Sequence, residues 1–496
     1  MSYQINLPQL GQVLTSEPGA NLYQLLAAAG LLDAPCGGNG TCGKCGVLID
    51  GVEHLACTYR VESDIMVLLP QQTQLQSITA DGYIKPFTAD PWPQGSYGVA
   101  VDIGTTTVIA TLYDLAQAQE VASLACLNSQ KAFGQDVISR INHAANQQKG
   151  TEELQALIIA DLTQLLNGLL AQNQLEVAAI KQITIAGNTT MIHLLAGIDP
   201  SSLGVSPYLP AFSGAVHLAA GKLGLPVECP VYCLPAVAAF VGGDIIAGLI
   251  ACDIDAAKGK TLFIDIGTNG EIVLANEGKM FCCSCAAGPA LEGMNISCGM
   301  RAAPGAIEEV RIAQGQVSVA TIGGAPACGL CGSGLLAAIA ELRRVGVIDA
   351  SGRLTGDPLV SKIAGKKGVL LTDNIYLGQS DIRHVQLSKG AILSGVLTLL
   401  DAAGVAVEQL DRVIIAGQFG LHLAAESIIG SGLLPAACQD KISYVGNTSK
   451  SGAALCLLSA AEREHSESLA EDIAYLELSA LEGYDERFID CLSFGH

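Results

Sequence analysis

Short runs of alternating apolar and polar residues begin the chain, and this alternation predicts strands. YQINLPQ (residues 3–9) and GQVLTSE (11–17) alternate along their length and together predict a hairpin. The next segment, NLYQLLAAAGLL (21–32), has the apolar spacing of a helix that packs on a sheet. The N-terminal part is therefore expected to be a small unit of strands with one packing helix.

Longer apolar strands follow residue 98, and they occur twice. VAVDIGTTTVIATLYDL (99–115) and LFIDIGTNGEIVLAN (262–276) each combine an apolar strand, the tetrapeptide Asp-Ile-Gly-Thr and a second strand. A second pair, ITIAGNTTMIHLL (183–195) and VIIAGQFGLHLAA (413–425), shares a strand, an Ala-Gly-polar turn and a helix. These repeats predict an α/β duplication, with two related lobes and a cleft between them.

Two further apolar stretches predict buried helices. LTQLLNGLLAQ (162–172) has the stripe of an ordinary core helix. LPAVAAFVGGDIIAGLIAC (234–252) is long enough to resemble a membrane span, but Asp244 and a Gly-Gly pair interrupt it and no cations flank it. We therefore expect no membrane association. The N-terminus lacks the basic start and apolar core of a signal peptide, which predicts a cytoplasmic protein.

The stretch GYIKPFTADPWPQGSYG (82–98) is rich in Pro and Gly and marks a domain boundary. A chain of 496 residues is too long for one compact core. We expect a small domain over residues 1–80, a flexible linker over 81–97 and a domain of two related lobes over 98–496.

The composition of the chain excludes some classes of function. Charged residues make up 15% of the chain and apolar residues 50%, as in a folded protein. Lys and Arg number 26 against 47 for Asp and Glu, without a basic run, so nucleic acid is not an expected partner. Seventeen cysteines in a cytoplasmic chain indicate metal ligands or reduced core thiols rather than disulfides.

Four of these cysteines have a distinctive spacing, Cys36-x5-Cys42-x2-Cys45-x11-Cys57. Asp50-Gly51 stands between the apolar runs GVLI and VEHLA and is a typical two-residue hairpin turn. With this turn, Cys57 lies opposite Lys44 and diagonal to Cys45. The hairpin would therefore return the fourth thiol to the other three.

Glycines around these thiols allow the loop to turn its amides toward negatively charged sulfur. They are Gly37, Gly38, Gly40, Gly43 and Gly46. Four thiolates in such a loop suit one two-iron two-sulfur cluster. Zinc is the alternative, but zinc ligands usually come as two separated pairs, whereas three ligands crowd one loop here. The pattern resembles plant-type ferredoxins, which implies a β-grasp fold.

The repeated Asp-Ile-Gly-Thr turns suit nucleotide chemistry. A hairpin tip of Gly and Thr offers amides and hydroxyls to phosphate oxygens, and a carboxylate at each strand end can orient hydrated Mg²⁺. Other nucleotide motifs fail, because AKGKT (257–261) lacks the upstream Gly of a P-loop and GLCGSG (329–334) has the wrong order of glycines for a dinucleotide site.

The repeats resemble the actin, sugar-kinase and heat-shock-chaperone ATPase superfamily, which implies a duplicated ribonuclease H-like fold. The resemblance implies a first phosphate motif formed by Asp102, Gly104, Thr105, Thr106 and Thr107. It implies a second phosphate motif formed by Asp265, Gly267, Thr268 and Asn269. It also implies an adenosine motif that contains Gly417 and Gly420. Asp244 and Glu271 are candidates for positioning the hydrolytic water. ATP and Mg are the implied cofactors.

A ferredoxin-like domain fused to this ATPase resembles the reductive activators of corrinoid proteins. FGQDVISRI (133–141), CAAGPALEGMNISCGMRAAPGAI (285–307) and YLELS (475–479) are among the segments that carry the resemblance. It implies ATP-dependent transfer of one electron to a Co(II) corrinoid of a methyltransferase-system protein, restoring Co(I), with a low-potential electron donor and a homodimer. Some members have an additional middle domain, whereas here the first phosphate motif directly follows the linker.

Several residues leave alternatives open. Two C-x2-C pairs, Cys282/Cys285 and Cys328/Cys331, with Cys283 between the first two, could bind a second metal, although tight packing is favoured. Single histidines beside apolar segments are more often core groups than cobalt ligands; they are His193, His384 and His422. Asp136 and Arg140 are spaced for a surface ion pair or a role in the cleft.

Two other functions also remain open at this level. One is a small-molecule kinase with a redox-sensing ferredoxin module, and the other is a non-catalytic, ATP-gated binding protein. A small substrate would stimulate ATP turnover by the kinase, a protein would stimulate turnover by the activator, and the binding protein would show almost no turnover.

Overall fold

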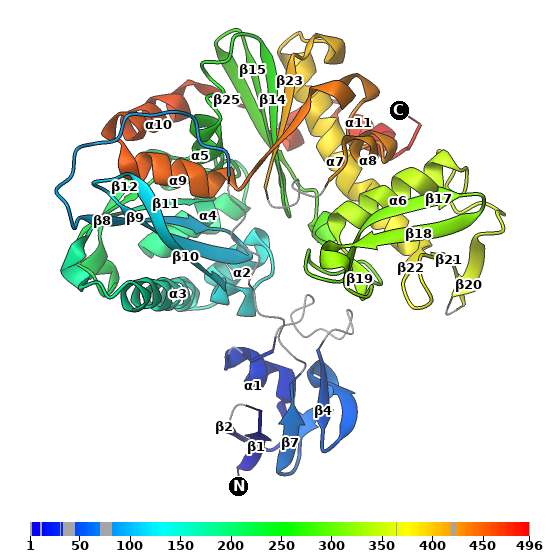
Figure 1. The fold of residues 1–496 in the computed structure, drawn as a ribbon, viewed down its shortest axis with the longest axis horizontal. Helices are drawn as coiled ribbons and strands as arrows, with labels where there is room; N and C mark the ends of the chain where they lie inside the picture. The colour runs from blue at the N-terminus through cyan, green and yellow to red at the C-terminus, as the bar shows by residue number, and fades with distance from the viewer. Residues whose placement is uncertain are drawn as a thin grey trace.

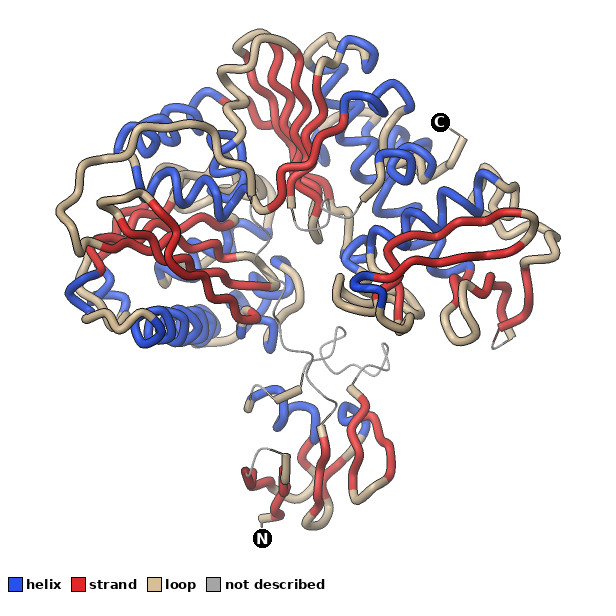
Figure 2. The backbone as a smooth tube through the Cα atoms, in the orientation of Figure 1, coloured by secondary structure: helices blue, strands red, loops and turns tan. Residues whose placement is uncertain are grey.

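The computed structural model describes residues 2–9, 12–29, 31–32, 45–69, 82–363, 365–417 and 423–495. Figure 1 shows a small N-terminal unit and a larger body of two lobes, each built on a sheet with helices around it. Figure 2 shows the two large sheets as separate groups of strands with helices beside each. The sequence-based α/β assignment is therefore confirmed.

The N-terminal unit is a mixed sheet with one helix. The strand order is β2-β1-β7-β4-β5, and β1 runs parallel to β7 while the other neighbours are antiparallel. The elements are β1 (Tyr3–Leu7), β2 (Gln12–Ser16), α1 (Leu22–Ala28), β4 (Gly46–Ile49), β5 (Val52–Leu55) and β7 (Ile65–Leu68), with a short β3 (Ala20–Asn21) paired to β6 (Arg60–Val61). Leu22 and Leu26 of α1 join Ile5 and Val67 in one buried cluster. This helix-on-sheet arrangement is the one expected of a β-grasp domain.

The β4–β5 hairpin has the predicted register. Gly46 pairs with Leu55 and Ile49 with Val52, which leaves Asp50 and Gly51 as the turn. Both turn residues have positive φ angles, 49° and 86°, as a two-residue turn matched to the twist of a hairpin requires.

The two lobes contain sheets that share the order of five strands and differ in the edge at which the sixth is added. The first sheet has the order β10-β9-β8-β11-β13-β12 and the second β24-β23-β14-β15-β16-β25. Their strands are β8 (Tyr97–Ile103), β9 (Thr107–Asp114), β10 (Gln119–Leu127), β11 (Ile180–Gly187), β12 (Val216–Ala219), β13 (Pro230–Cys233), β14 (Lys260–Ile266), β15 (Gly270–Asn276), β16 (Lys279–Cys285), β23 (Arg412–Ala416), β24 (Ile442–Gly446) and β25 (Ile473–Tyr475). In both sheets the strand with Asp-Ile-Gly-Thr is central and lies between its antiparallel hairpin partner and a parallel strand. The predicted duplication is confirmed.

Helices cover both sheets. They are α2 (Val137–Asn146), α3 (Gly150–Gln172), α4 (Thr189–Ala196), α5 (Gly243–Ala251), α6 (Gly332–Arg344), α7 (Gln379–Ala402), α8 (Ala425–Gly430), α9 (Thr448–Leu458), α10 (Ala460–Asp472) and α11 (Tyr484–Cys491). Within the described residues, α3 is the one helix whose length and composition would let it cross a membrane. Its buried face, which includes Leu154, Ile158 and Leu165, packs on β9 and β10 as in a core helix.

Helices α5 and α9 lie against each other where the two lobes meet. Helix α9 follows the second sheet in the chain but packs on β8 and β11 of the first. Helix α5 follows the first sheet, and a Cβ added at its Gly248 would lie 2.7 Å from Phe263 of β14 in the second. The two helices touch backbone to backbone, since a Cβ at Gly452 would lie 2.1 Å from the Ala247 carbonyl oxygen. The apolar stretch around Asp244 is thus a buried helix, as predicted.

The second lobe also carries two smaller sheets, of order β18-β17-β19 and β20-β21-β22. They contain β17 (Ala306–Ala313), β18 (Gln316–Thr321), β19 (Gly329–Leu330), β20 (Val360–Ile363), β21 (Lys366–Leu370) and β22 (Tyr376–Gly378). Helix α6 packs on β17, and α7 runs from β22 back to β15 and β16. These sheets extend the second lobe beyond the repeated core.

Residues 82–96 depart from the flexible linker that was expected. They contain no helix or strand, yet the backbone N–H groups of Tyr83, Lys85 and Asp90 donate to the carbonyls of Val445, Ala251 and Leu458 at 2.8, 3.0 and 2.8 Å. Phe87 and Trp92 pack against the apolar cluster that contains α5 and α9. We call residues 82–96 the strap. Figure 1 shows it as the blue segment that passes these helices on its way to β8.

Candidate functional site

Two of the four predicted cluster ligands lie together in the N-terminal unit. The Sγ atoms of Cys45 and Cys57 are 3.1 Å apart, and the Cys57 N–H donates to the Cys45 Sγ at 3.4 Å. Both side chains are buried. The hairpin therefore brings these two thiols into one site, and the pair is a suitable set of donors for iron or zinc. Cys36 and Cys42 lie outside the described residues, so the complete ligand set stays a prediction.

Two of the four predicted catalytic carboxylates, Asp102 and Asp265, come from equivalent places in the two lobes. Asp102 lies near the end of β8 and Asp265 near the end of β14. Asp244 is in the first turn of α5, and Glu271, at the start of β15, pairs with Asp265 across the hairpin.

These four side chains are close enough to influence one another's pKa. Burial, followed by the charges of Asp265 and Asp102, raises the pKa of Asp244 to about 7. Burial and the charge of Asp102 raise the pKa of Asp265 to about 6. The pKa of Glu271 is raised well above its ordinary value by burial and by Asp244 and Asp265. The repulsion among these carboxylates would fall if a cation lay among them.

The chemistry of this acidic group fits a hydrated magnesium ion. Among the described residues no group of three or more His, Cys, Asp or Glu is arranged to hold a metal ion directly. Magnesium often keeps several of its waters and is held through one or two carboxylates together with substrate phosphates. Asp102 and Asp265 would then hold the ion through water.

Asp102 has two partners that the sequence analysis missed. Asn447 Nδ2 donates to its Oδ2 at 2.9 Å, and Ser449 Oγ donates to its Oδ1 at 2.7 Å. Burial raises the pKa of Asp102, and these two hydrogen bonds lower it. Ser449 and Asp244 are each the second residue of a helix, α9 and α5. The Gly-Asn-Thr-Ser run that follows β24 was the signal available in the sequence.

The first phosphate turn is held by a network of polar groups. Gly104 N–H donates to the Thr107 carbonyl at 3.0 Å and closes the turn between β8 and β9. A Cβ at Gly104 would lie 2.8 Å from that carbonyl oxygen, so only glycine fits there without a shift. Asn128 donates from its side chain to the Gly104 carbonyl and from its backbone to the Thr106 carbonyl, both at 2.9 Å.

Arg140 completes this network, and the surface ion pair considered for it is wrong. Its side chain is fully buried, and its guanidinium donates to the carbonyl of Thr105 in the phosphate turn. Asp136 instead caps α2 by accepting from the Ser139 N–H at 2.8 Å. Burial lowers the pKa of Arg140 to about 10, and the charges of Asp136 and Asp161 oppose that change. Asn188 Nδ2 donates to the Thr105 hydroxyl at 3.2 Å.

The second phosphate turn, between β14 and β15, is one residue tighter than the first. Gly267 N–H donates to the Asn269 carbonyl at 2.9 Å, and the Thr268 hydroxyl donates to Glu292, which the sequence analysis did not single out. Gly417 approaches this turn closely, because a Cβ there would lie 2.8 Å from the Asp265 Oδ1. Its φ of +88° also favours glycine. Gly420 lies outside the described residues.

Comparison with known proteins agrees with this architecture. A family model described as the C-terminal ASKHA domain of RACo matches residues 259–496, and one described as the RACo middle region matches residues 97–257. The curated "Corrinoid activation enzyme RamQ" of Eubacterium limosum is 33% identical over 419 residues, which cover 80% of this chain and 70% of that protein. The chain belongs to the reductive activators of corrinoid proteins.

Two further relatives resemble the activator. The "[Co(II) methylated amine-specific corrinoid protein] reductase" of Methanosarcina barkeri is 24% identical over 387 residues, 71% of this chain and 68% of that protein. A solved structure titled "Reductive activator for corrinoid,iron-sulfur protein" is 30% identical and superposes with a TM-score of 0.75, covering 100% of this chain and 98% of the other. The activator is thus an enzyme of corrinoid activation with an actin-like, ATP-dependent domain.

The two family models divide the activator between its lobes. The middle-region model covers the first lobe, from β8 to α5, and the ASKHA model begins at the start of β14. The expectation that this chain lacks the middle region is therefore wrong, because the middle-region model matches the segment that follows the strap and carries the first phosphate motif.

Several of the other cysteines and histidines that the sequence analysis singled out are packed in the interior. Cys282, Cys283 and Cys285 are buried on β16, and Cys331 is buried with its Sγ donating to the Ile307 carbonyl, whereas Cys328 is exposed. His193 stacks on Phe212 and bonds the Thr189 carbonyl at 2.8 Å. His384 is distinct, because its Nδ1 is buried without a hydrogen-bond partner. His422 lies outside the described residues.

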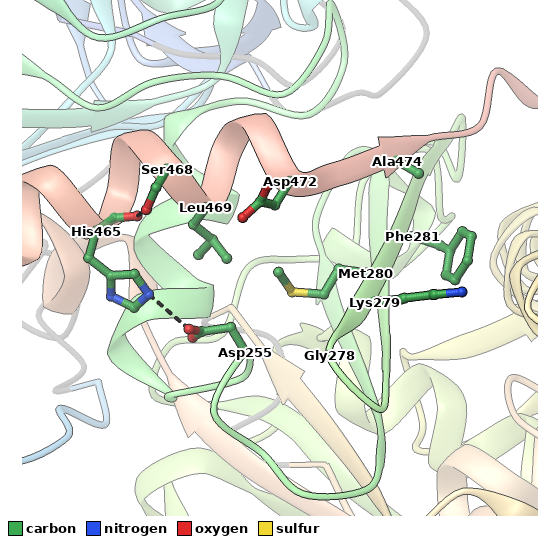
Figure 3. A pocket seen from close by; sticks show the side chains of 10 residues that line it. All are labelled: Asp255, Gly278, Lys279, Met280, Phe281, His465, Ser468, Leu469, Asp472 and Ala474. Carbon is green, nitrogen blue, oxygen red and sulfur yellow. Dashed lines mark hydrogen bonds and ion pairs between the residues drawn. The ribbon is translucent and has the colours of Figure 1, made fainter.

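A cavity of about 750 Å³ lies between α10 and the edge formed by β16 and β25. None of the phosphate-motif residues lines it. Figure 3 shows His465 and Asp255 pointing toward each other at its border, with Nε2 and Oδ2 2.8 Å apart. The hydrogen bond that His465 donates to Asp255 raises the pKa of His465 despite partial burial. The cavity is therefore separate from the acidic group.

Proposed function

We propose that the activator uses ATP to transfer one electron from a two-iron two-sulfur cluster to the Co(II) of a corrinoid held by a methyltransferase-system protein. Cys36, Cys42, Cys45 and Cys57 would hold the cluster. The observation that carries this proposal is that, in a member of this family, one chain joins a buried Cys45–Cys57 pair to an acidic, duplicated nucleotide site.

The electron balance is simple. The reduced cluster loses one electron, and Co(II) gains it and becomes Co(I). A low-potential donor returns one electron to the cluster. ATP and water give ADP and phosphate in a separate reaction, so ATP supplies free energy and no electrons.

The need for ATP follows from the potentials. The reduction potential of plant-type clusters is about −400 mV. Moving one electron uphill by about 100 mV costs about 2.3 kcal/mol. Closure of the two lobes around nucleotide would change which state of the partner is bound, and this differential affinity would supply the free energy.

The nucleotide site has a role for each predicted residue. The Gly and Thr residues of the two turns, Gly104 to Thr107 and Gly267 to Asn269, would hold phosphate oxygens. Gly417 and Gly420 would lie beside the adenosine. Asp244 and Glu271 would position the attacking water, and an Asp244 pKa of about 7 suits a group that accepts a proton near neutral pH. Magnesium would screen the phosphate charge.

We also propose the surroundings in which this occurs. The domains are residues 1–80, 81–97 and 98–496, with the strap forming the described part of the second. The partners are a corrinoid-binding protein and a low-potential electron donor, the activator is a homodimer, and the reaction takes place in the cytoplasm.

The deciding experiment follows Co(I) in the absorbance spectrum of a Co(II) corrinoid partner. Reduced activator alone should leave the partner largely as Co(II), and addition of Mg-ATP should produce Co(I). ATP turnover should rise when the partner is added. ATP turnover that a small molecule stimulates instead would indicate a kinase. Formation of Co(I) without nucleotide, when the electron donor is no more reducing than the cluster, would contradict the mechanism.

A further inference from the structure

The strap begins at the nucleotide site. Asn447 is 7% exposed and caps α9 by accepting from the Lys450 N–H at 3.0 Å, while its Nδ2 holds the Asp102 carboxylate at 2.9 Å. Gly82, the first residue of the strap, lies against the backbone of the same Asn447. The chain that arrives from the N-terminal unit thus meets the helix end that positions a nucleotide-site carboxylate.

The contact at Gly82 is too close for any side chain. A Cβ at this position would lie 2.2 Å from the Asn447 carbonyl oxygen and 2.4 Å from the Ser451 hydroxyl oxygen. The first of these atoms belongs to the backbone and cannot move without shifting the first turn of α9. The next residue fixes the strap there, because the Tyr83 N–H donates to the Val445 carbonyl at 2.8 Å.

The rest of the strap is bonded to α5, α9 and α10. Lys85 donates from its backbone to Ala251, the last residue of α5, and its Nζ lies 3.2 Å from Asp253 and 3.1 Å from Glu462. Asp90 accepts from the Ala460 N–H at 2.9 Å and from Arg463 at 3.4 Å. If α9 moves relative to α5, the strap must therefore move or lose some of these contacts.

We propose that Gly82 and Asn447 are positioning residues that couple the nucleotide site to the iron–sulfur domain. Nucleotide bound at Asp102 shifts the Asn447 end of α9, the Gly82 contact passes this shift to the strap, and the attachment point of the iron–sulfur domain moves with it. This inference rests on the proposed function, because it assigns the path by which nucleotide state reaches the electron donor.

The first test is amide hydrogen exchange of the complete protein with and without Mg-ATP. The exchange rates of the Tyr83 and Lys85 amides should change when nucleotide binds, and Asp265→Ala should abolish the change. Calorimetry on the same samples reports nucleotide binding. Failure to bind would overturn both the proposed function and this inference, whereas binding with unchanged exchange at both amides would overturn this inference alone.

The second test substitutes Gly82→Ala, with Gly214→Ala as the matched control because a Cβ at Gly214 meets nothing within 4 Å. Gly82→Ala should keep the cluster spectrum and still bind and hydrolyse Mg-ATP, while the Co(I) formed per ATP hydrolysed falls at least about fivefold. Gly214→Ala should keep the wild-type ratio. A Gly82→Ala protein that couples as well as this control would overturn the proposal. If Gly82→Ala does not fold, the exchange measurement on the wild-type chain decides.

Discussion

At the scale of single residues, the proposed nucleotide site contains carboxylates whose ionisation opposes folding. Asp244, Asp265 and Glu271 are brought together with Asp102 although burial and mutual repulsion raise the pKa of each. Ionising them in the folded state costs free energy that the unfolded chain does not lose. The buried carboxylates thus lower the stability of the fold, and they also concentrate negative charge where a cation can bind and a water can be polarised.

Asp244→Asn should reveal this cost. The folded-state pKa of Asp244 is raised to about 7, from about 4 in an unfolded chain. The folded state therefore binds more protons between these values, so the stability contribution present below pH 4 is lost as pH rises to 7. We expect Asn to raise the free energy of unfolding at pH 8 by roughly 1–3 kcal/mol, measured by denaturant melts, and to lower ATP turnover by at least about tenfold.

The exposed Asp373 provides the matched control. Asp373→Asn should leave both the pH dependence of unfolding and ATP turnover as in the wild type. An Asp244→Asn protein that is no more stable than wild type at pH 8, with full turnover, would show that Asp244 neither carries the burial penalty nor acts on water.

At the scale of elements, the β4–β5 hairpin determines the geometry of the thiol site. The turn at Asp50 and Gly51 sets the register, and Cys57 follows two residues after the end of β5, beside Cys45. A one-residue slip would turn every side chain of β5 to the other face. The turn residues are therefore expected to control cluster retention without touching the cluster.

Gly51→Ala should lower the temperature at which the cluster is lost. Gly51 has a φ of +86° and open space around it, so alanine adds backbone strain and no clash. Strain of this kind costs about 1 kcal/mol. Visible absorbance during heating should show earlier loss of the cluster, with unchanged ATP turnover. Gly214→Ala, which has the same added methyl group and no positive φ, should melt as the wild type does.

At the scale of the whole molecule, two chemical sites depend on separate cores. The thiol pair belongs to the N-terminal cluster of apolar residues, whereas the elements that carry the acidic group contribute to other clusters, one of which spans both lobes. Each site should therefore survive a lesion in the other, although electron transfer requires both.

Cys57→Ala and Asp265→Ala should each disable one half. Cys57→Ala should lose the visible absorbance and the electron paramagnetic signal of the reduced cluster while binding Mg-ATP normally in calorimetry. Asp265→Ala should keep the reducible cluster and lose Mg-ATP turnover, and neither should yield Co(I). The exposed Cys328→Ala serves as the thiol control. A normal cluster in Cys57→Ala would contradict its assignment as a ligand.

The sequence by itself determined the features that depend on local spacing. The Asp50-Gly51 turn and its register, the two Asp-Ile-Gly-Thr hairpins and the buried helix around Asp244 could all be predicted, because turn chemistry and apolar periodicity act over a few residues. The duplication could be predicted because the same local pattern occurs twice.

Only the tertiary structure decided which distant residues complete the site. Asn447 is 345 residues from Asp102 along the chain, and their hydrogen bond exists because α9 crosses from the second lobe to pack on the first sheet. Arg140 is buried beside Thr105, and the strap is docked rather than free, for the same kind of reason. Such contacts depend on how whole elements pack, and no local pattern of residues encodes them.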